Sequence, residues 1–235
     1  MRINKYLSGA GYCSRREADR LVEAGRVTVN GETASMGSQV EEGQIVCVDG
    51  NVVATEEEMI LLAVNKPVGI VCTTTDKQGK NNIVDFIGYH KRIYPVGRLD
   101  KDSEGLLLMT NNGDIMDKIL RSANGHEKEY IVEVDKCIDD IFLKKMSEGV
   151  YLSELDRTTK PCKIYKEGRC KFRIIITQGL NRQIRRMCSE LGREVVSLKR
   201  VRIMNVLLGD LPVGSYREVT KEEYRRLCEA TESNN

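Results

Sequence analysis

Charged side chains crowd into one short loop, residues 97–105, with the sequence Gly-Arg-Leu-Asp-Lys-Asp-Ser-Glu-Gly. Asp100 stands there between Arg98 and Lys101. A carboxylate held beside cations can attack a substrate or abstract a proton. Because packing several carboxylates between apolar runs does not stabilise a fold, the pattern indicates an active site with Asp100 at its centre.

Other interpretations of this loop stay open when only its residues are considered. It could be a solvated hairpin, or Asp100 could be a structural ion-pair partner. It could also bind calcium, since its acidic residues nearly fill the first positions of an EF-hand loop. That loop needs a bidentate glutamate where this chain has Asn111, and it needs helices on both sides.

The elements that must position the loop are two apolar runs. Residues 93–96 lead into it and residues 106–109 lead out of it, and both are predicted to be half-buried strands. A buried strand is also predicted for residues 59–65, and Pro67 and Gly69 break it. We expect these strands to share one sheet.

A second candidate is a helix predicted after Asn181, where Ile184 and Met187 belong to its apolar stripe. Its other face carries arginines, which on most helices are simply solvated. These arginines are Arg182, Arg185 and Arg186. A third candidate is Tyr130, which opens an alternating strand, although an aromatic residue there most often packs across strands.

Four stretches together resemble one family. They are GRLDKDSEGLLLMTNNGD at 97–114, HEKEY at 126–130, QGLNRQIRRM at 178–187 and LKRVRIMNV at 198–206. The first three are similar to motifs of the pseudouridine synthases, specifically the RsuA-type branch that modifies ribosomal RNA. With the fourth, the chain looks closest to the RluF-type large-subunit members. The resemblance covers roughly residues 1–225.

This resemblance implies a role for each candidate. Asp100 corresponds to the essential carboxylate, Tyr130 to the tyrosine over the target uracil, and Arg185 to the arginine that pairs with the aspartate. The implied reaction isomerises uridine to pseudouridine within RNA: the glycosidic carbon–nitrogen bond breaks, the uracil turns, and its carbon five bonds to the ribose. Nothing is oxidised or hydrolysed overall, so neither a cofactor nor a metal is expected.

The target uridine must be flipped out of its stack, which costs a few kcal/mol that contacts with RNA must offset. Residues 181–202 carry seven basic and two acidic side chains, although the net charge of the chain is only +2. This local excess marks where phosphates could lie. The residues expected to grip flanking phosphates are Arg98, Lys101, Arg182, Arg186 and Arg200.

The first fifty residues predict a compact unit of two helices and short strands. Apolar spacing gives a helix over residues 3–10, and the capping box Ser14-x-x-Glu17 opens another. Basic side chains lie on or beside both helices: Lys5, Arg15, Arg16 and Arg20. Six basic and seven acidic residues in this region favour simple solvation, but the run resembles the alpha-L, ribosomal S4-like RNA-binding domain. The resemblance implies RNA docking.

The predicted fold class is α+β. We expect an alpha-L domain over residues 1–50, a linker over 51–58 and a catalytic domain over 59–230, whose mostly antiparallel or mixed sheet carries flanking helices. The family resemblance adds that two halves of this sheet meet at a cleft with the catalytic loop on its floor.

Composition limits the class of protein. No apolar run approaches the ~20 residues of a membrane span, and the eight cysteines show no paired metal spacing, so we expect a cytoplasmic protein with reduced thiols. The sequence does not encode the oligomeric state, and a monomer is the expectation. The expected partner is ribosomal RNA, the large subunit favoured, free or in an assembling particle. One alternative is a synthase for small-subunit or transfer RNA. The other is a non-catalytic assembly factor, which would be indicated if the Asp, Tyr or Arg of the motifs were missing; all three are present.

Overall fold

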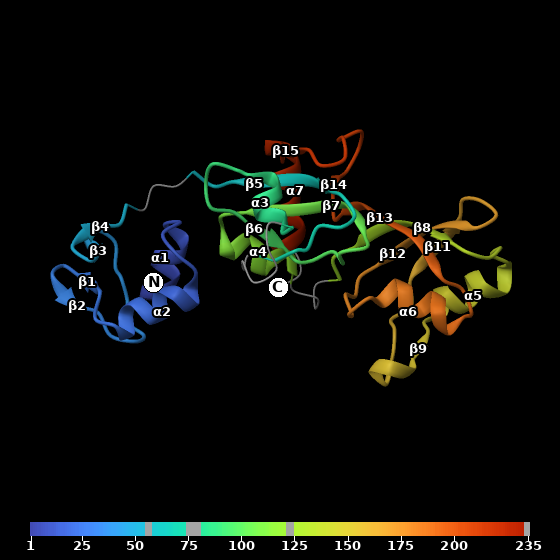
Figure 1. Cartoon of the computed structure of the whole chain (residues 1–235), viewed down its shortest axis with the longest axis horizontal. Coiled ribbons are helices and arrows are strands. Elements are labelled where there is room, and N and C mark those ends of the chain that lie inside the picture. The colour runs from blue at the N-terminus through green and yellow to red at the C-terminus, as the bar shows by residue number, and fades with distance from the viewer. Residues whose placement is uncertain (55–57, 74–80, 121–124, 233–235) are drawn as a thin grey trace. The chain divides into compact units, whose positions relative to one another are not determined.

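The computed structural model describes residues 1–54, 58–73, 81–120 and 125–232. It divides into two compact units, which Figure 1 colours from blue to red along the chain. The first unit holds residues 1–60 with the short segments 90–92 and 111–113, and the second holds the remainder. Within the described ranges, no helix is long and apolar enough to cross a membrane.

The first unit packs two helices on a small sheet with the strand order β2-β1-β3-β4. Its elements are α1 (Ile3–Gly9), α2 (Arg15–Glu23), β1 (Val27–Val29), β2 (Glu32–Thr33), β3 (Val46–Val48) and β4 (Asn51–Val52). Ser14 caps α2 by accepting a hydrogen bond from the Glu17 amide, as the capping box predicts. Strand β4 pairs with β3, so regular structure continues past residue 50, where a linker was predicted. Residues 55–57 of that linker lie outside the described residues.

The second unit is built on one nine-stranded sheet, in which β11-β12-β8-β13-β7-β5-β15 are neighbours, β6 pairs with β7 and β14 pairs with β13. Its strands are β5 (Leu61–Lys66), β6 (Tyr94–Val96), β7 (Glu104–Thr110), β8 (Lys128–Val134), β11 (Lys163–Lys166), β12 (Lys171–Ile176), β13 (Val195–Ile203), β14 (Val206–Leu207) and β15 (Tyr216–Glu218). Every pairing is antiparallel except that of β13 with β7. The mixed, mostly antiparallel sheet confirms the predicted α+β class.

The parallel pairing of β13 with β7 is short and joins the two halves of the sheet. Arg200 lies opposite Gly105 in it. Gly105 has a φ of +101°, and a Cβ atom there would stand 2.2 Å from the Arg200 carbonyl oxygen. Only glycine fits so close to a neighbouring backbone. The junction therefore lies at the residue that ends the charged loop.

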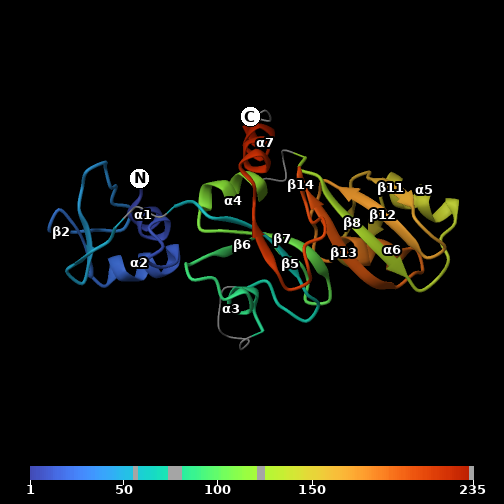
Figure 2. The same ribbon diagram turned by 90° about the horizontal axis from the view of Figure 1, so that it is seen from above.

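Helices cover both halves of this sheet, as Figure 2 shows from above. Two of these helices pack on the apolar side chains of β5 and β7 through Ile115, Ile119 and Leu227. Phe142 packs edge-on against Phe172 of β12 in the other half. The remaining elements are α3 (Ile83–Ile87), α4 (Gly113–Leu120), α5 (Asp140–Glu148), α6 (Gln183–Glu190), α7 (Lys221–Glu232), β9 (Tyr151–Leu152), η3 (Ser153–Leu155) and β10 (Arg157–Thr158).

Candidate active site

The charged loop between β6 and β7 is held by backbone hydrogen bonds. The Gly69 amide donates to the Lys101 carbonyl oxygen at 2.7 Å, and the Leu99 amide donates to the Cys72 Sγ at 3.4 Å. Within the loop, the Ser103 amide donates to the Asp100 carbonyl oxygen at 3.1 Å. The segment that follows β5 therefore fixes the backbone that carries Asp100.

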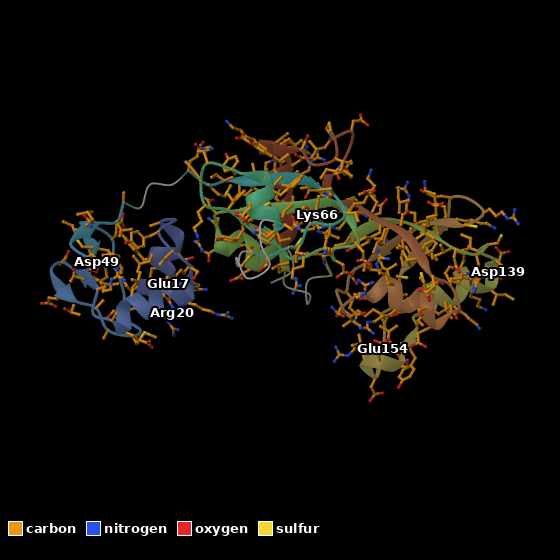
Figure 3. All side chains as sticks on the ribbon, in the orientation of Figure 1. Glu17, Arg20, Asp49, Lys66, Asp139 and Glu154 are labelled. Atoms are coloured by element: carbon orange, nitrogen blue, oxygen red, sulfur yellow. The ribbon has the colours of Figure 1, made fainter. Side chains whose placement is uncertain are left out.

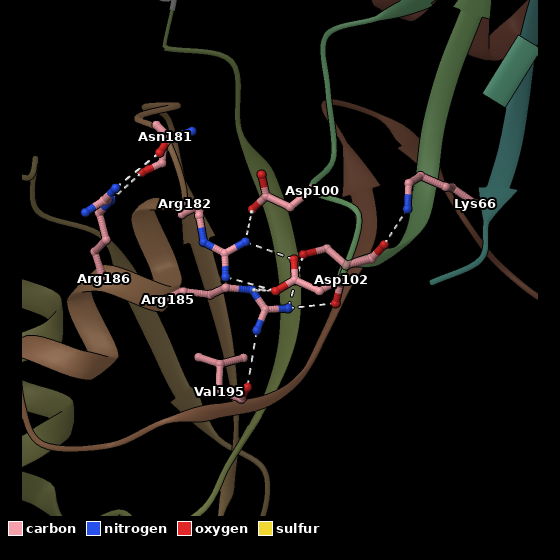
Figure 4. Close-up of polar contacts among 9 residues, drawn as sticks. Lys66, Asp100, Asp102, Asn181, Arg182, Arg185, Arg186 and Val195 are labelled. Atoms are coloured by element: carbon pink, nitrogen blue, oxygen red, sulfur yellow. Dashed lines mark hydrogen bonds and ion pairs between the residues drawn. The ribbon is translucent and has the colours of Figure 1, made fainter. Parts of the chain in front are cut away.

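Lys66, the last residue of β5, supports the same loop from inside the protein. Its side chain is completely buried, and its Nζ donates to the carbonyl oxygens of Pro67 at 2.9 Å and Ser103 at 2.7 Å. Burial lowers the pKa of this amine. Figure 3 shows Lys66 within the second unit, and Figure 4 shows its contact with the loop.

The two aspartates of the loop have different surroundings (Figure 4). Arg182 donates to both carboxylate oxygens of Asp102, at 3.0 and 2.9 Å, and these hydrogen bonds lower the pKa of Asp102. Asp100 lies 3.8 Å from the nearest Arg182 nitrogen, and its side chain is 33% exposed. Asp102 is thus engaged as an anchor, whereas Asp100 keeps oxygen atoms available to a substrate.

Arg185 does not form the ion pair with Asp100 that the resemblance implies. Its Nε forms an ion pair with Asp102 at 3.4 Å, and its Nη2 donates to the Asp102 carbonyl oxygen at 2.7 Å and to the Ser103 Oγ at 3.3 Å. Its Nη1 donates to the Val195 carbonyl oxygen at 3.2 Å. These anchors hold the guanidinium at the far end of the loop, and among the described residues the arginine within 4 Å of the Asp100 carboxylate is Arg182.

Arg182 begins α6 in a backbone conformation that is rare for a residue with a side chain. As the N-cap of α6 it has a φ of +50° and a ψ of 33°. The left-handed region costs a non-glycine residue about 1–3 kcal/mol, and such strain persists where surrounding contacts fix it. Here the ion pairs with the loop carboxylates fix it, and they aim the guanidinium at Asp102 and Asp100.

Tyr130 and Arg200 lie side by side in the sheet. They are register partners in β8 and β13, and the Arg200 guanidinium carbon stands 6.0 Å from the centre of the Tyr130 ring. Arg200 is only 3% exposed, and its Nε donates to the Leu106 carbonyl oxygen at 2.6 Å. This burial leaves the guanidinium little surface for a flanking RNA phosphate, so the placement of Arg200 gives its predicted phosphate contact no support.

The other predicted phosphate contacts differ in how available they are. Arg98 and Lys101 are exposed. Arg186 forms an ion pair with Glu154 and donates through Nε to the Asn181 carbonyl oxygen at 3.0 Å. A pocket of about 240 Å³ is lined by Arg182, Arg185 and Arg186 and by three glutamates, Glu154, Glu190 and Glu194. An RNA phosphate entering this pocket would have to compete with carboxylates that the arginines already hold.

In the first unit, the predicted RNA contacts lie on one helix and its neighbour. Arg15, Arg16 and Arg20 of α2 are exposed, and Arg20 forms an ion pair with Glu17 at 3.1 Å (Figure 3). Lys5 of α1 is half-buried. Buried Ala18, Leu21 and Val22 take up the opposite face of α2, which leaves the arginines facing solvent.

Several residues of the site escaped sequence reasoning. Lys66 directly follows the apolar run of residues 59–65, and neither it nor Ser103 was assigned a role. Asp102 was counted only among the crowded carboxylates of the loop, because the sequence does not show which of them holds an arginine. In the described ranges, no three His, Cys, Asp or Glu side chains gather as a metal site requires.

Comparisons with known proteins match two family models to this chain. The family model for RNA pseudouridylate synthase matches residues 60–190, and the S4 domain model matches residues 1–46. Among similar proteins, the dual-specificity RNA pseudouridine synthase RluF of Shigella flexneri is 53% identical over 95% of this chain and 77% of its own length. The ribosomal large subunit pseudouridine synthase B of Bacillus subtilis is 34% identical over 96% and 95%.

A solved structure extends the similarity to three dimensions. A crystal structure of a pseudouridylate synthase aligns with a TM-score of 0.71 at 28% identity, covering 97% of this chain and 99% of the other. The first of these models covers the charged loop and α6, and the second covers the exposed arginines of α2. The chain belongs to the RNA pseudouridylate synthase family and carries an S4 domain at its front.

Proposed function

We propose that this protein isomerises specific uridines to pseudouridine in ribosomal RNA of the large subunit, with Asp100 as the reacting carboxylate. The observation that carries the assignment of Asp100 is the contrast between the two loop aspartates. Asp102 holds Arg182 in a bidentate ion pair, while Asp100 stays partly exposed at 3.8 Å from the same guanidinium. A carboxylate that is positioned but not fully engaged can react.

The remaining residues position this carboxylate and the uracil. Arg182 supplies the nearby cation, and Arg185 ties the end of the loop to β13. Tyr130 supplies an aromatic surface for the detached uracil. It lies two strands from Gly105, so its Cα is about 10 Å from that of the residue ending the loop, given the ~4.8 Å spacing of paired strands.

The names of the relatives support the choice of RNA. The Bacillus subtilis relative is named for the large ribosomal subunit. The relatives named RluF are called dual-specificity enzymes, which favours a second RNA target as well. Small-subunit and transfer RNA are the candidates for that second target.

We further propose that the S4 domain docks RNA through Arg15, Arg16 and Arg20, with Lys5 beside them. Their exposure supports this role, because a phosphate can reach them without displacing the core of the unit. A substrate in ribosomal RNA, free or in an assembling particle, fits a cytoplasmic protein.

The first test is site-resolved pseudouridine mapping of total RNA from cells with and without this gene. We expect at least one site in large-subunit ribosomal RNA to disappear and to return with the wild-type gene. Loss confined to small-subunit or transfer RNA would correct the substrate. No lost site, with the protein expressed, would favour a non-catalytic assembly factor.

The second test separates the two aspartates in the purified protein. Asp100→Asn should bind RNA and unfold at the wild-type temperature but form no pseudouridine. Asp102→Asn, the matched control, should keep measurable turnover because it disturbs an anchor and not the reacting group. Turnover by Asp100→Asn at a rate near that of Asp102→Asn would remove Asp100 from its role.

A further inference from the structure

Two cations share a face of the sheet with Tyr130. Lys128 and Tyr130 are two residues apart in β8, so their side chains lie on the same face. Arg200 is the direct partner of Tyr130 in β13. We call Lys128, Tyr130 and Arg200 the Tyr130 face.

An irregularity in β13 separates Arg200 from the next arginine. Arg200 pairs with Tyr130 and Arg202 pairs with Glu129, so two steps along β13 match one step along β8. This bulge turns Arg202 to the opposite face, where it forms ion pairs with Glu127 and Glu129. Without the bulge, both arginines would lie on the Tyr130 face.

Neither cation of the Tyr130 face has a carboxylate partner within 4 Å among the described residues. The Arg200 Nη2 is buried and has no hydrogen-bond partner in the described protein, while its Nε uses only the Leu106 carbonyl oxygen. Unpaired buried charge is costly to a fold. A negative group that arrives during the reaction would offset this cost.

The fields of these cations reinforce one another. Burial, followed by the charge of Arg200, lowers the pKa of Lys128. Arg200 also acts in the same sense on Lys66, the buried amine below the charged loop. The charge of Arg200 therefore acts both on the lysine of the Tyr130 face and on the buried lysine that supports the loop, whereas Asp100 and Asp102 act on Lys66 in the opposite sense.

The reaction supplies the matching negative charge. When the glycosidic bond breaks, its electron pair stays on the uracil N1, and the charge spreads to the two carbonyl oxygens. The charge is consumed when carbon five bonds to the ribose. Loss of the carbon-five proton to a base and uptake of a proton at N1 then give the neutral product. This inference rests on the function proposed above. We propose that Arg200 and Lys128 are positioning residues: they hold Tyr130, and their charges stabilise the anionic uracil that the reaction detaches.

The test compares variants that keep the charge with variants that remove it. Arg200→Gln and Lys128→Gln remove it, and Arg200→Lys and Lys128→Arg keep it. Removing one preorganised stabilising group from a water-poor site commonly slows a reaction about 10²- to 10³-fold. We expect losses of this order in single-turnover rate for the charge-removing variants, unchanged RNA affinity, and substantial recovery in the charge-keeping variants.

A second substrate distinguishes stabilisation of the anion from a merely structural role. Fluorine on carbon five withdraws electrons, so RNA with 5-fluorouridine at the target releases a more stable anion. Loss of the parent nucleoside should then depend at least tenfold less on Arg200 and Lys128 than it does with uridine. A misfolded or displaced Tyr130 would slow both substrates equally.

Arg202→Gln is the control for removing an arginine from β13, because its side chain lies on the opposite face. It should lose stability and keep its rate per folded molecule. If the charge-removing variants stay within about threefold of the wild type, or lose equal factors on both substrates, the proposed role is wrong. Should Arg200→Gln fail to fold, Lys128→Gln decides alone. Wild-type protein inert on all RNA would instead overturn the proposed function itself.

Discussion

The two faces of the β8–β13 pair use the same residue types in opposite ways. On one face, Glu129 accepts from Arg202 at 2.6 Å and is also paired with Arg173. Glu127 there pairs with Arg202 at 3.0 Å and with Lys163 at 2.9 Å. We call these residues the Glu129 face. On the Tyr130 face, the cations have no carboxylate partner among the described residues.

This difference separates charge that serves the fold from charge that serves the reaction. The pKa of Glu129 is lowered although burial opposes the shift, because Arg202 and Arg173 both donate hydrogen bonds to it. Its charge is satisfied before any substrate arrives. The Tyr130 face instead has positive charge in excess, which the fold tolerates and a substrate can match.

The largest effect is expected from a substitution that forces β7 away from β13. Gly105→Ala would place a methyl group 2.2 Å from the Arg200 carbonyl oxygen at a φ of +101°. Overpacking of this kind costs about 1–3 kcal/mol, and the forced shift moves both the loop and Arg200. We expect a lower free energy of unfolding and at least about 10²-fold slower single-turnover catalysis, since a misplacement of 1 Å can have that effect.

Gly168→Ala is the control for that experiment, because its Cβ would meet only the Lys171 Cβ at 3.5 Å. It should change neither rate nor stability noticeably. Wild-type catalysis by Gly105→Ala would show that the close approach of β7 to β13 is not needed to position the site.

The α6 arginines offer a smaller perturbation. Arg185→Gln removes contacts with Asp102, Ser103 and β13, whereas Arg182→Gln removes the bidentate pair with Asp102. We expect about a 10²-fold loss of single-turnover rate for Arg185→Gln, because the loop end is freed, and about tenfold for Arg182→Gln. The reverse order would show that proximity to Asp100 outweighs support of the loop.

The sequence predicted much of this fold because the signals were local. The Ser-x-x-Glu spacing at Ser14 predicts a helix start from residues three positions apart, and Ser14 accepts from the Glu17 amide as expected. The strand predicted over residues 59–65 is present as β5, Leu61–Lys66. The charged loop likewise lies between two strands, as its flanking runs indicate.

Features that depend on distant residues could not be predicted in this way. Apolar residues at 195–198 and 201–208 predict two strands, but β13 runs unbroken from Val195 to Ile203, since its bulges keep Arg200 paired with β8 and β7 together. Burial of Arg200 follows from that double pairing. The apolar residues 70–72 predict a further strand, yet Val71 forms an isolated bridge with Asn82.

On the Glu129 face, removal of one charge should affect the fold and leave the reaction alone. Glu129→Gln weakens hydrogen bonds to two arginines, and losing bonds between charged groups costs about 1–3 kcal/mol. Chemical denaturation should show that loss, with the single-turnover rate per folded molecule unchanged. Lys163→Gln, which breaks an exposed pair, should stay within about 0.5 kcal/mol of the wild type. A large rate loss in Glu129→Gln would show that the Glu129 face also contributes to the reaction.

The smallest expected effect is a pH dependence at the charged loop. Hydrogen bonds from Arg182, with the charge of Arg185 in addition, lower the pKa of Asp102. Its stabilising contribution is therefore complete above the ordinary aspartate pKa of about 4 and is lost as pH falls through the lower folded value. Because the carboxylate is 47% exposed, solvent screens the effect. Thermal unfolding should show wild type and Asp102→Asn converging as pH falls below about 4, whereas a constant difference down to low pH would mean that Asp102 supports the loop through packing and not through its charge.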